Sequence, residues 1–392
     1  MSPTHGKDLV IRAIRHWLIY VPFGKPISWA SGTRPGSTRL VVEVTTEGGV
    51  RGYGETICLL DFVEPVLAKV VAPIALGRSV AEAERVFRHV EAAGYYHHKR
   101  AMVMATAAVE MAMWDALGKH ASLPLHALWG GLMRPRVEMC AYLFISDPAA
   151  LKDEAQRFKA QGYRSFKVKV GLDPADDVRI VRAVREAIGP HANLRGDPNG
   201  AWTPGTARRQ LAALREFDLQ YIEQPLPVDD MLGHAELRRC QATPIAIDEG
   251  AYTLADVTNA VRLGAADVIL LDPHETGGLW QCIKAAGVCE GAGIPVGLHS
   301  GGELGLSQAA YLHLAASIPN MSIAVDTEYY YQSEDILPER LEFIDGHCAV
   351  PTGPGLGVEP DVALLERFRT DRVRGAYLNV DRRDWIPTKP AY

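Results

Sequence analysis

The sequence predicts an α/β protein in which a TIM-type (β/α) barrel follows a separate N-terminal α+β domain. From about Glu138 onward, a short apolar run, a polar residue, a turn and an amphipathic stretch recur as one unit. The apolar run occurs eight times, and the polar residues that end successive runs lie 23 to 28 positions apart. The preceding residues lack this repeat, and a chain of 392 residues is long enough for two domains.

The apolar runs are the expected barrel strands. In order along the chain they read EMCAYLFI, SFKVKV, ANLRG, LQYIE, PIAI, ADVILL, IPVGL and MSIAV. The stretches between them, such as residues 175–188 and 206–217, carry apolar side chains at steps of three and four residues, which predicts helices. Alternating strands and helices predict a parallel sheet. A barrel of roughly 200–250 residues gives each of its eight units about 25–31 residues, which matches the observed interval.

The N-terminal region is expected to combine strands and helices. Residues 40–45 and 50–53 flank a Glu-Gly-Gly turn and predict a hairpin, and residues 103–119 predict a helix. We place the N-terminal domain at residues 1–134, the barrel at residues 135–352, and at residues 353–392 a C-terminal segment that packs back on the first domain.

Composition excludes several classes of protein. Lys and Arg number 41 against 47 Asp and Glu, a net charge of −6 without blocks of like charge, which gives no support for nucleic-acid binding. The six cysteines are scattered without a CxxC pair, so we expect reduced thiols in a cytoplasmic protein. The first residues lack the apolar core of a signal peptide, and no run of 18 apolar residues appears, so we expect no membrane partner.

Three acidic residues end neighbouring runs, and they are the candidate metal ligands. In a TIM barrel the C-terminal strand ends meet at one mouth, so Asp197, Glu223 and Glu249 should lie around one point. Carboxylates so close together repel one another strongly, and a hard divalent cation bound between them offsets this repulsion. Ligands that are all oxygen favour Mg²⁺ over Zn²⁺. The alternative is that each carboxylate pairs with a neighbouring basic side chain.

Two further pairs are candidates for acid–base chemistry. Lys167 and Lys169 stand two positions apart on one strand, so both point to the same face, here into the barrel. Burial near a metal should lower their pKa values and make a lysine available as a base. Asp272 and His299 end the sixth and seventh runs, where the carboxylate would fix the imidazole tautomer. The alternatives are an edge strand with exposed lysines, and a capping aspartate beside an unrelated histidine.

Three polar residues are candidates for substrate binding. Asn199 follows Asp197 by two positions and could donate a hydrogen bond, or could serve only as a turn residue. Asp326 and Glu328 end the eighth run. They could bind a substrate hydroxyl or carboxylate, or could pair with Arg or Lys.

These motifs occur in an order that resembles the enolase superfamily, on the mandelate racemase side of the mandelate racemase/muconate lactonizing enzyme family. The matching segments are SFKVKVG, GDPNGAW, YIEQPL, IAIDEG, LLDPHETGG and GLHSGGELG, with RGYGET and AVEMAMWDALGKH before the barrel. The resemblance covers nearly the whole chain. It implies a modified (β/α)7β barrel, an N-terminal capping domain, bound Mg²⁺, a small carboxylate substrate and a homo-oligomer. The muconate cycloisomerase side carries a lysine where this chain has Asp272.

Within that family the chain looks most like the D-glucarate dehydratases. FKVK, DPNGAW, DPH, HSGGELG, AVDTEYYY and PTGPGLGVE carry this similarity. The chain differs in having Gln224 where those enzymes tend to have aspartate, Glu249 where they have asparagine, and glycines in HSGGELG where they have polar side chains. As third metal ligand, Glu249 keeps the strand interval, whereas Asp248 fits the cycloisomerase pattern.

The expected activity is removal of the proton α to a carboxylate to give an enediolate, followed by β-elimination of water from an acid sugar. The metal and a protonated Lys167 would stabilise the enediolate, and Lys169 or His299 would remove the proton. A Gly-rich loop at residues 27–38 is expected to close over the site. The alternatives are a racemase, epimerase or cycloisomerase on the same scaffold, and more remotely a non-catalytic binding protein.

Overall fold

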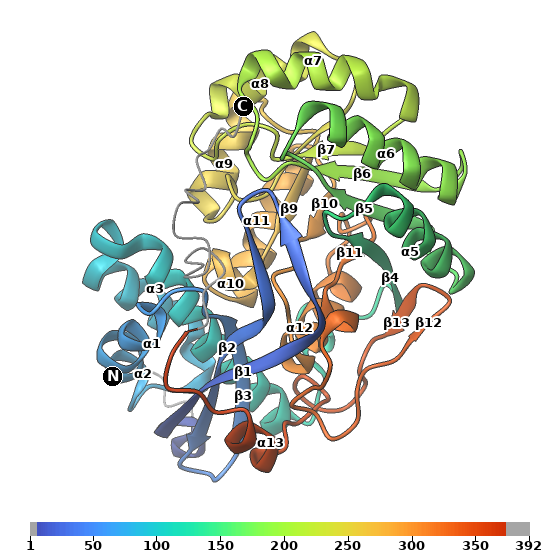
Figure 1. Cartoon of the computed structure of the whole chain (residues 1–392). Helices are drawn as coiled ribbons and strands as arrows, with labels where there is room; N and C mark the ends of the chain where they lie inside the picture. Colours follow the sequence, from blue (N-terminus) through green and yellow to red (C-terminus); the bar gives the residue numbers. More distant parts are fainter. Residues whose placement is uncertain (1–5, 374–392) are drawn as a thin grey trace.

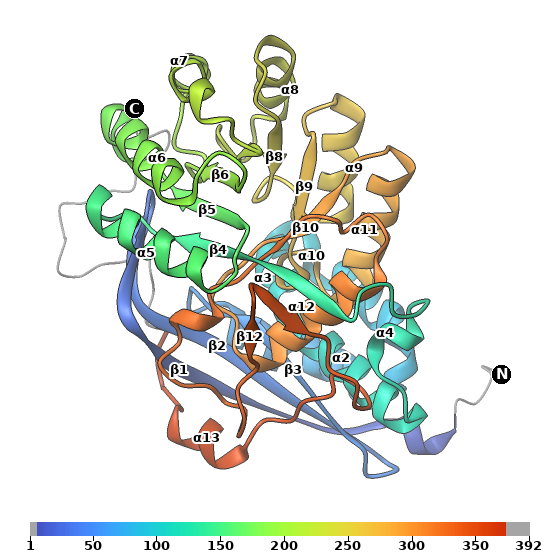
Figure 2. The ribbon, with the colours of Figure 1, turned by 90° about the vertical axis from the view of Figure 1, so that its right-hand side faces the viewer.

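The computed structural model describes residues 6–373, apart from the side chains of residues 95–98. In this part of the chain, an antiparallel N-terminal sheet with its helices packs beside a barrel of parallel strands (Figures 1 and 2). This arrangement confirms the predicted fold class. Residues 374–392, which belong to the predicted C-terminal segment, lie outside the described residues.

The N-terminal sheet has three antiparallel strands, β1 (Ile11–Trp29), β2 (Gly32–Thr46) and β3 (Arg51–Ile57). The predicted hairpin is confirmed as the β2–β3 pair. The predicted loop at residues 27–38 is wrong, because most of these residues pair within β1 and β2, with Trp29 opposite Gly32. The resulting long ribbon runs from the sheet up alongside the barrel (Figure 1, blue).

One long helix, α3 (Ala83–Ala121), forms the main support of the N-terminal sheet and includes the predicted residues 103–119. It lies so close to β3 that a Cβ at Gly52 or Gly54 would overlap the backbone of Ala112 or Ala108, so both positions require glycine. The part of α3 from Lys99 to Ala121 is apolar and long enough to cross a membrane, but its most apolar stretch is 83% buried, as in a core helix. The shorter elements of this domain are η1 (Lys7–Leu9), α1 (Val63–Val66), η2 (Leu67–Val71), α2 (Ala72–Ala75), η3 (Val80–Glu82) and α4 (Leu125–Leu128).

Eight parallel strands form the barrel, and each overlaps one of the eight predicted runs, the last of them only at Val325. They are β4 (Arg136–Leu143), β5 (Ser165–Lys169), β6 (Asn193–Asp197), β7 (Tyr221–Glu223), β8 (Ile245–Ile247), β9 (Val268–Leu271), β10 (Val296–Leu298) and β11 (Val325–Asp326). Neighbours in sequence pair from β4 to β10, and β11 pairs with β4. The N–H of Val296 donates to the carbonyl of Asn320 at 2.9 Å, which connects β10 to the segment before β11.

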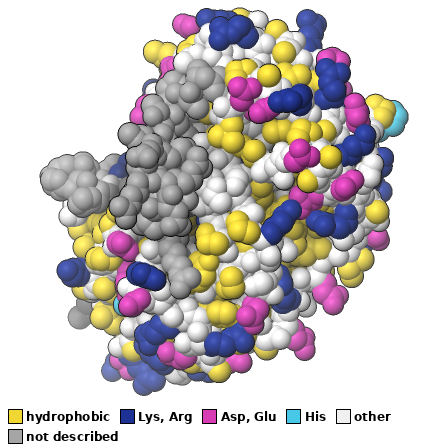
Figure 3. All heavy atoms as spheres, viewed as in Figure 1, with side chains coloured by type: hydrophobic (Ala, Val, Ile, Leu, Met, Phe, Trp, Pro, Cys, Tyr) yellow, Lys and Arg dark blue, Asp and Glu magenta, His cyan; other side chains and the backbone are white. Residues whose placement is uncertain are grey.

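Helices cover the outside of the barrel between successive strands. They are α5 (Pro148–Ala160), α6 (Pro174–Ile188), α7 (Pro204–Leu214) with η4 (Arg215–Phe217), α8 (Met231–Cys240), α9 (Leu254–Leu263), α10 (Pro273–Thr276), α11 (Leu279–Gly291) and α12 (Gly305–Ser317). On the face drawn in Figure 3, basic and acidic side chains are interspersed, in line with the mixed charge of the sequence.

Two barrel helices take their N-terminal caps from the N-terminal domain. Helices α5 to α9 each have a side-chain cap of their own, from Asp147, Asp173, Thr203, Asp230 and Thr253. Helices α11 and α12 have none. Glu110 of α3 accepts from the N–H groups of Leu279 and Trp280 at the start of α11. Glu55 of β3 accepts from the N–H groups of Leu304 and Ser307 at the start of α12. The N-terminal domain is therefore docked on the barrel through buried carboxylates.

The chain after the barrel returns toward the N-terminal sheet. It contains η5 (Tyr329–Tyr331), the strands β12 (Phe343–Ile344) and β13 (His347–Ala349), and α13 (Val362–Arg367). Strand β13 pairs antiparallel with β4. Beyond α13, the N–H of Tyr20 donates to the carbonyl of Phe368, and the N–H of Thr370 donates to the carbonyl of Leu18, each at 2.9 Å. These bonds join residues 368–370 to β1.

Candidate active site

The barrel strands bring the predicted polar residues to one end of the sheet. Lys169, Asp197 and Glu223 are the last residues of β5, β6 and β7. Asp248, Asp272 and His299 each directly follow a strand, namely β8, β9 and β10. Because parallel strands of a barrel end at a common mouth, residues up to 130 positions apart in the chain (169 to 299) become neighbours.

Lys167 lies inside the barrel, surrounded by carboxylates. Its Nζ is 3.2 Å from Asp197 Oδ2 and 2.8 Å from Asp326 Oδ2, and it also pairs with Glu223. Burial alone would lower the pKa of Lys167, but Asp326, Glu223 and Asp197 outweigh it and raise the pKa well above its usual value. The prediction of a lowered pKa was made for a site that holds a metal cation, and without that cation the carboxylates around Lys167 shift its pKa upward instead.

Lys169 contacts the same cluster from the side nearer the mouth. Its Nζ pairs with Asp197 and donates to Asn199 Oδ1 at 2.9 Å. Burial would raise the pKa of Asp197, but the ammonium groups of Lys169 and Lys167 lower it far below its usual value. Asn199 adopts a left-handed backbone conformation with φ 46°, and its N–H donates to Asp197 Oδ1 at 2.8 Å. This turn directs the Asn199 side chain toward Lys169.

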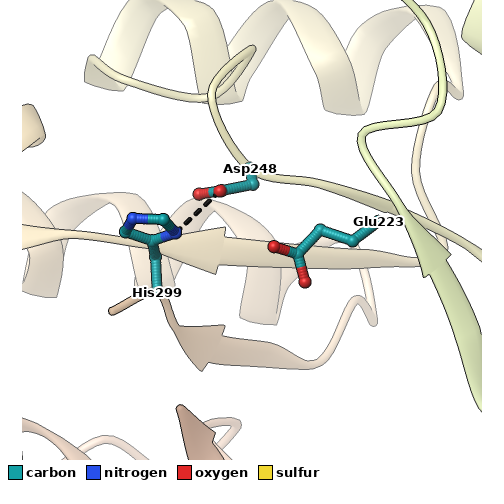
Figure 4. Close-up of side chains that lie close together, drawn as sticks. All are labelled: Glu223, Asp248 and His299. Atoms are coloured by element: carbon teal, nitrogen blue, oxygen red, sulfur yellow. Dashed lines mark ion pairs between the residues drawn. The ribbon is translucent and has the colours of Figure 1, made fainter. Parts of the chain in front are cut away.

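Glu223, Asp248 and His299 form a group that can hold a divalent metal. Each offers a ligand atom, and these atoms lie within 4.8 Å of one another. In Figure 4 the Glu223 carboxylate points toward the Asp248–His299 pair. Glu223 Oε2 is buried without a hydrogen-bond partner in the described part of the chain. Burial, together with the nearby charges of Asp197 and Asp248, raises the pKa of Glu223 well above its usual value. A divalent cation would relieve this repulsion, so the residues fit a metal.

Asp248 and Glu249 were the two candidates for the third oxygen ligand, and the structure separates them. Asp248 lies in the group around Glu223, whereas Glu249 Oε1 accepts from Asn199 Nδ2 at 2.8 Å. Gln224 Oε1 accepts from the N–H of Asp248 at 3.2 Å and so holds the turn after β8. The geometry favours Asp248, with Glu249 beside the cavity.

His299 pairs with a different carboxylate from the one that the sequence suggested. Its Nδ1 is 2.7 Å from Asp248 Oδ2 (Figure 4), and no hydrogen bond joins it to Asp272 among the described residues. Asp272 instead caps α10, where its Oδ1 accepts from the N–H of His274 at 2.7 Å and from the hydroxyl of Tyr311 at 3.1 Å. The expected direct Asp272–His299 contact is therefore absent from the described structure.

Asp272 still acts on His299 through its charge. Burial alone would lower the pKa of His299, but Asp248, Glu275 and Asp272 outweigh it and raise that pKa well above its usual value. Burial raises the pKa of Asp272 to about 6, although the nearby His299 opposes this shift.

A cavity of about 570 Å³ opens at this mouth, between the barrel and the N-terminal domain. Five candidate site residues line it, namely Lys169, Asn199, Glu249, His299 and Glu328. Residues of the N-terminal domain complete the wall, namely Trp29, Ser31, Arg34, Ile57, Leu59 and Arg100. Tyr142, Phe144, Val228, Asp229, Tyr252, Glu275, Ser300 and Gly301 line the rest.

Asp326 and Glu328 have different surroundings. Asp326 lies deeper than the cavity, where it pairs with Lys167 and with Arg195 at 3.1 Å, which favours the ion-pair alternative. Glu328 lines the cavity and pairs with Arg34 from the β1–β2 ribbon. We had not singled out Arg34 from the sequence. The only available signal was its place in residues 27–38, which we expected to cover the site.

Comparison with known proteins gives a consistent picture. Residues 150–364 match the family described as enolase C-terminal domain-like, and residues 16–130 match the mandelate racemase / muconate lactonizing enzyme N-terminal domain. The chain is similar to a protein from Streptomyces coelicolor named "Probable glucarate dehydratase", at 34% identity over 98% of this chain and 100% of that one. It is also similar to N-succinylamino acid racemase from an Amycolatopsis species, at 34% identity over 91% of this chain and 96% of that one.

A solved structure has the same architecture over the full length. An enolase from Mycobacterium smegmatis, complexed with tartrate, superposes with a TM-score of 0.90 at 29% identity and covers 100% of both chains.

Proposed function

This chain belongs to the mandelate racemase/muconate lactonizing enzyme family of the enolase superfamily, and on that premise we propose that it is a Mg²⁺-dependent acid-sugar dehydratase. The proton α to a substrate carboxylate is removed, and a β-hydroxyl group of the resulting enediolate leaves as water. The product becomes a 2-keto acid after tautomerisation. The observation that carries this proposal is that Lys169 and His299, from different strands, line one cavity beside the buried carboxylates.

Asp197, Glu223 and Asp248 are the proposed metal ligands, with Glu249 as the alternative to Asp248. Bound Mg²⁺ would supply positive charge that offsets these carboxylates and stabilises negative charge on the substrate oxygens. Lys167 also stabilises negative charge on the substrate. Its raised pKa keeps it protonated, so its ammonium group adds to the positive potential beneath the substrate carboxylate.

Lys169 is the proposed base for one face of the substrate. Its Nζ is held by Asn199 and Asp197 at the edge of the cavity, and transfer of the α-proton to it requires an unprotonated amine. His299 lines the same cavity, and its raised pKa suits a group that gives a proton to the departing hydroxyl. Asn199 and Glu328 are proposed to bind substrate oxygens. Asp326 acts indirectly, by holding Lys167.

Racemisation or epimerisation is the second candidate. Two groups able to exchange protons line one cavity, which is the arrangement that exchange of a proton between two faces requires. The 34% identity to an N-succinylamino acid racemase supports this candidate as much as the dehydratase relative supports the first. Cycloisomerisation has less support, because this chain has Asp272 at the position where the muconate cycloisomerase side carries a lysine. A non-catalytic binding protein has no need for Lys169 and His299 in one cavity.

The test is a screen of Mg²⁺-loaded protein against mono- and dicarboxylic acid sugars, with detection of 2-keto acid. A dehydratase yields 2-keto acid from at least one of them. Deuterium incorporation at the α-carbon in D₂O without 2-keto acid would favour the racemase. The control is Glu223→Gln, which keeps the shape of a buried side chain and removes its charge. Full activity of this variant, folded by circular dichroism, would overturn the proposed metal site.

The cellular location and the oligomeric state are also part of this proposal. The cysteines that the structure describes are all free, and five of the six are buried, which fits a reducing cytoplasm. Homo-oligomers are implied by the family resemblance. Size-exclusion chromatography with light scattering tests this expectation.

A further inference from the structure

Two polar groups of the β1–β2 ribbon are buried at the cavity without a partner. Arg34 is 6% exposed and Ser31 is 5% exposed, and both line the cavity. Arg34 Nε and Ser31 Oγ have no hydrogen-bond partner in the described part of the chain. A buried donor without a partner costs free energy, and such groups call for an explanation in function.

The contacts of Arg34 leave one edge of its guanidinium for a ligand. Its Nη2 pairs with Glu328, and its Nη1 lies 3.4 Å from the carbonyl of Gly301. Its guanidinium carbon also lies 5.4 Å from the ring centroid of Phe23 and 5.7 Å from that of Trp29, so both aromatic rings contact the group. The group is therefore immobilised before a ligand arrives, which reduces the entropy that binding costs.

Gly302 makes the space in which Arg34 lies. A Cβ at this position would overlap the Ser37 hydroxyl and would lie 3.1 Å from Arg34 Nη2 and 3.3 Å from Glu328 Oε2. The glycine, at φ +80°, belongs to the HSGGELG stretch that follows β10. A cation from the N-terminal domain thus occupies a place that a barrel side chain would otherwise fill.

Among the described Lys and Arg side chains that line the cavity, Arg34 is the one suited to a distal anion. Lys169 is paired with Asp197 and belongs to the proposed chemistry. Arg100 is exposed and stacks on Tyr252, with its guanidinium 3.7 Å from the ring centroid. Arg34 is buried and has a spare donor, and a planar guanidinium matches a carboxylate better than it matches a single hydroxyl.

We propose that Arg34 and Ser31 form a second carboxylate-binding subsite, so that the substrate is a dicarboxylate. One carboxylate is bound at the metal site and the other accepts from Arg34 Nε and Ser31 Oγ. This inference rests on the proposed function, because it presumes that the first carboxylate binds at the barrel mouth. A monocarboxylate of the same length would leave both buried donors unpaired, and sites of this kind reject such analogues strongly.

The test compares matched acids that differ only in the second carboxylate. The probes are glucarate against gluconate, and tartrate against threonate, titrated calorimetrically into Mg²⁺-loaded protein. Wild type is expected to bind the diacid of at least one pair at least about 10-fold more tightly. Arg34→Met should weaken diacid binding by about 10- to 100-fold and change monoacid binding by less than about 3-fold. Arg100→Met, a change at an exposed arginine of the same cavity, should keep the wild-type preference.

Ser31→Ala is the second variant, because it breaks no ion pair and should fold even if Arg34→Met does not. It should weaken diacid binding by about 3- to 10-fold and leave monoacid binding unchanged. A wild-type preference for monoacids, or an equal loss of both acids in the variants, would overturn the subsite. Failure of the proposed function has a different signature: the diacid binds with its Arg34 dependence intact, but no α-proton exchanges with D₂O and no 2-keto acid forms.

Discussion

At the residue scale, the third metal ligand is the position where strand geometry decides between two neighbours. Side chains alternate along a strand, so Asp248 lies on the same face of β8 as Ala246. Ala246 packs with Tyr221 and Leu270 in a cluster inside the barrel. Glu249 has the opposite parity and bonds to Asn199 at the cavity edge. Alternation therefore directs Asp248 toward Glu223.

We predict that Asp248→Asn weakens Mg²⁺ binding more than Glu249→Gln does. Loss of a ligand should exceed the roughly 10- to 100-fold reduction that changes in the surrounding hydrogen bonds cause. Glu249→Gln should remain within that smaller range. Calorimetric titration of Mg²⁺ into the apoprotein measures both without reference to activity. The reverse order of the two effects would return the assignment to Glu249.

Residue spacing predicted much of this site and failed where neighbours compete. The regular interval between strand ends identified Lys169, Asp197 and Glu223, which the structure brings together. The same interval favours Glu249, because a count along the chain ignores which face each side chain takes. The partner of His299 was also not predictable, because Asp272 is occupied by the N-terminus of α10 and Asp248 is not.

At the element scale, the borrowed caps of α11 and α12 make parts of the barrel dependent on the N-terminal domain. Glu110 Oε2 accepts from the N–H of Leu279 at 2.8 Å, and its Oε1 accepts from the N–H of Trp280 at 2.9 Å. Sequence rules for helix caps cannot find this contact, because the acceptor Glu110 lies about 170 residues before the donor Leu279 in the chain.

Glu110→Ala is expected to lower the free energy of unfolding by about 2–3 kcal/mol, because the backbone N–H groups of Leu279 and Trp280 and the indole N–H of Trp114 lose their acceptor. The matched control is Asp147→Ala, which removes the exposed cap that α5 supplies itself and should cost about 1 kcal/mol. Urea unfolding compares the two. Hydrogen exchange should also quicken at the start of α11 in Glu110→Ala alone. Equal losses of unfolding free energy in both variants would show that the cap from the N-terminal domain stabilises the fold no more than a local cap does.

Elements with a local periodic pattern were predictable, and elements that depend on distant partners were not. The barrel strands are apolar runs, whereas the β1–β2 ribbon contains Gly24, Pro26 and Gly36 and was expected to be a loop around residues 27–38. Its strands exist because β1 and β2 pair along their length. Strand β13 is short and forms through its pairing with β4.

At the scale of the whole molecule, buried polar contacts join the N-terminal domain to the loops that hold the chemistry. Arg39 of β2 is fully buried and pairs with Glu55 of the same sheet. Its Nη1 donates to the carbonyl of Gly301 at 3.2 Å, and its Nη2 lies 3.0 Å from His274 Nε2. These residues follow His299 and Asp272 closely in the chain. We therefore expect the two domains to unfold together rather than separately.

His313 marks a second junction, where the barrel, the end of the N-terminal domain and the C-terminal segment meet. Its Nε2 donates to the carbonyl of Leu356 at 3.0 Å, since a carbonyl can only accept. Its Nδ1 lies 3.1 Å from His126 Nδ1 and must accept while His313 is neutral. Burial lowers the pKa of His313 to about 4, although the bond to Leu356 opposes this shift.

This arrangement predicts a loss of stability in acid that depends on one side chain. The unfolded chain binds a proton at the usual histidine pKa of about 6.5, and the folded chain binds it only near 4. The stabilising contribution is therefore complete above about pH 6.5 and falls by about 3 kcal/mol as the pH drops toward 4. His313→Gln can still donate to Leu356 but does not titrate. The thermal midpoint of this variant should fall less than that of wild type between pH 7 and pH 4.5. An equal fall in both proteins would contradict the role of His313, because other titrating groups would then account for all of the lost stability.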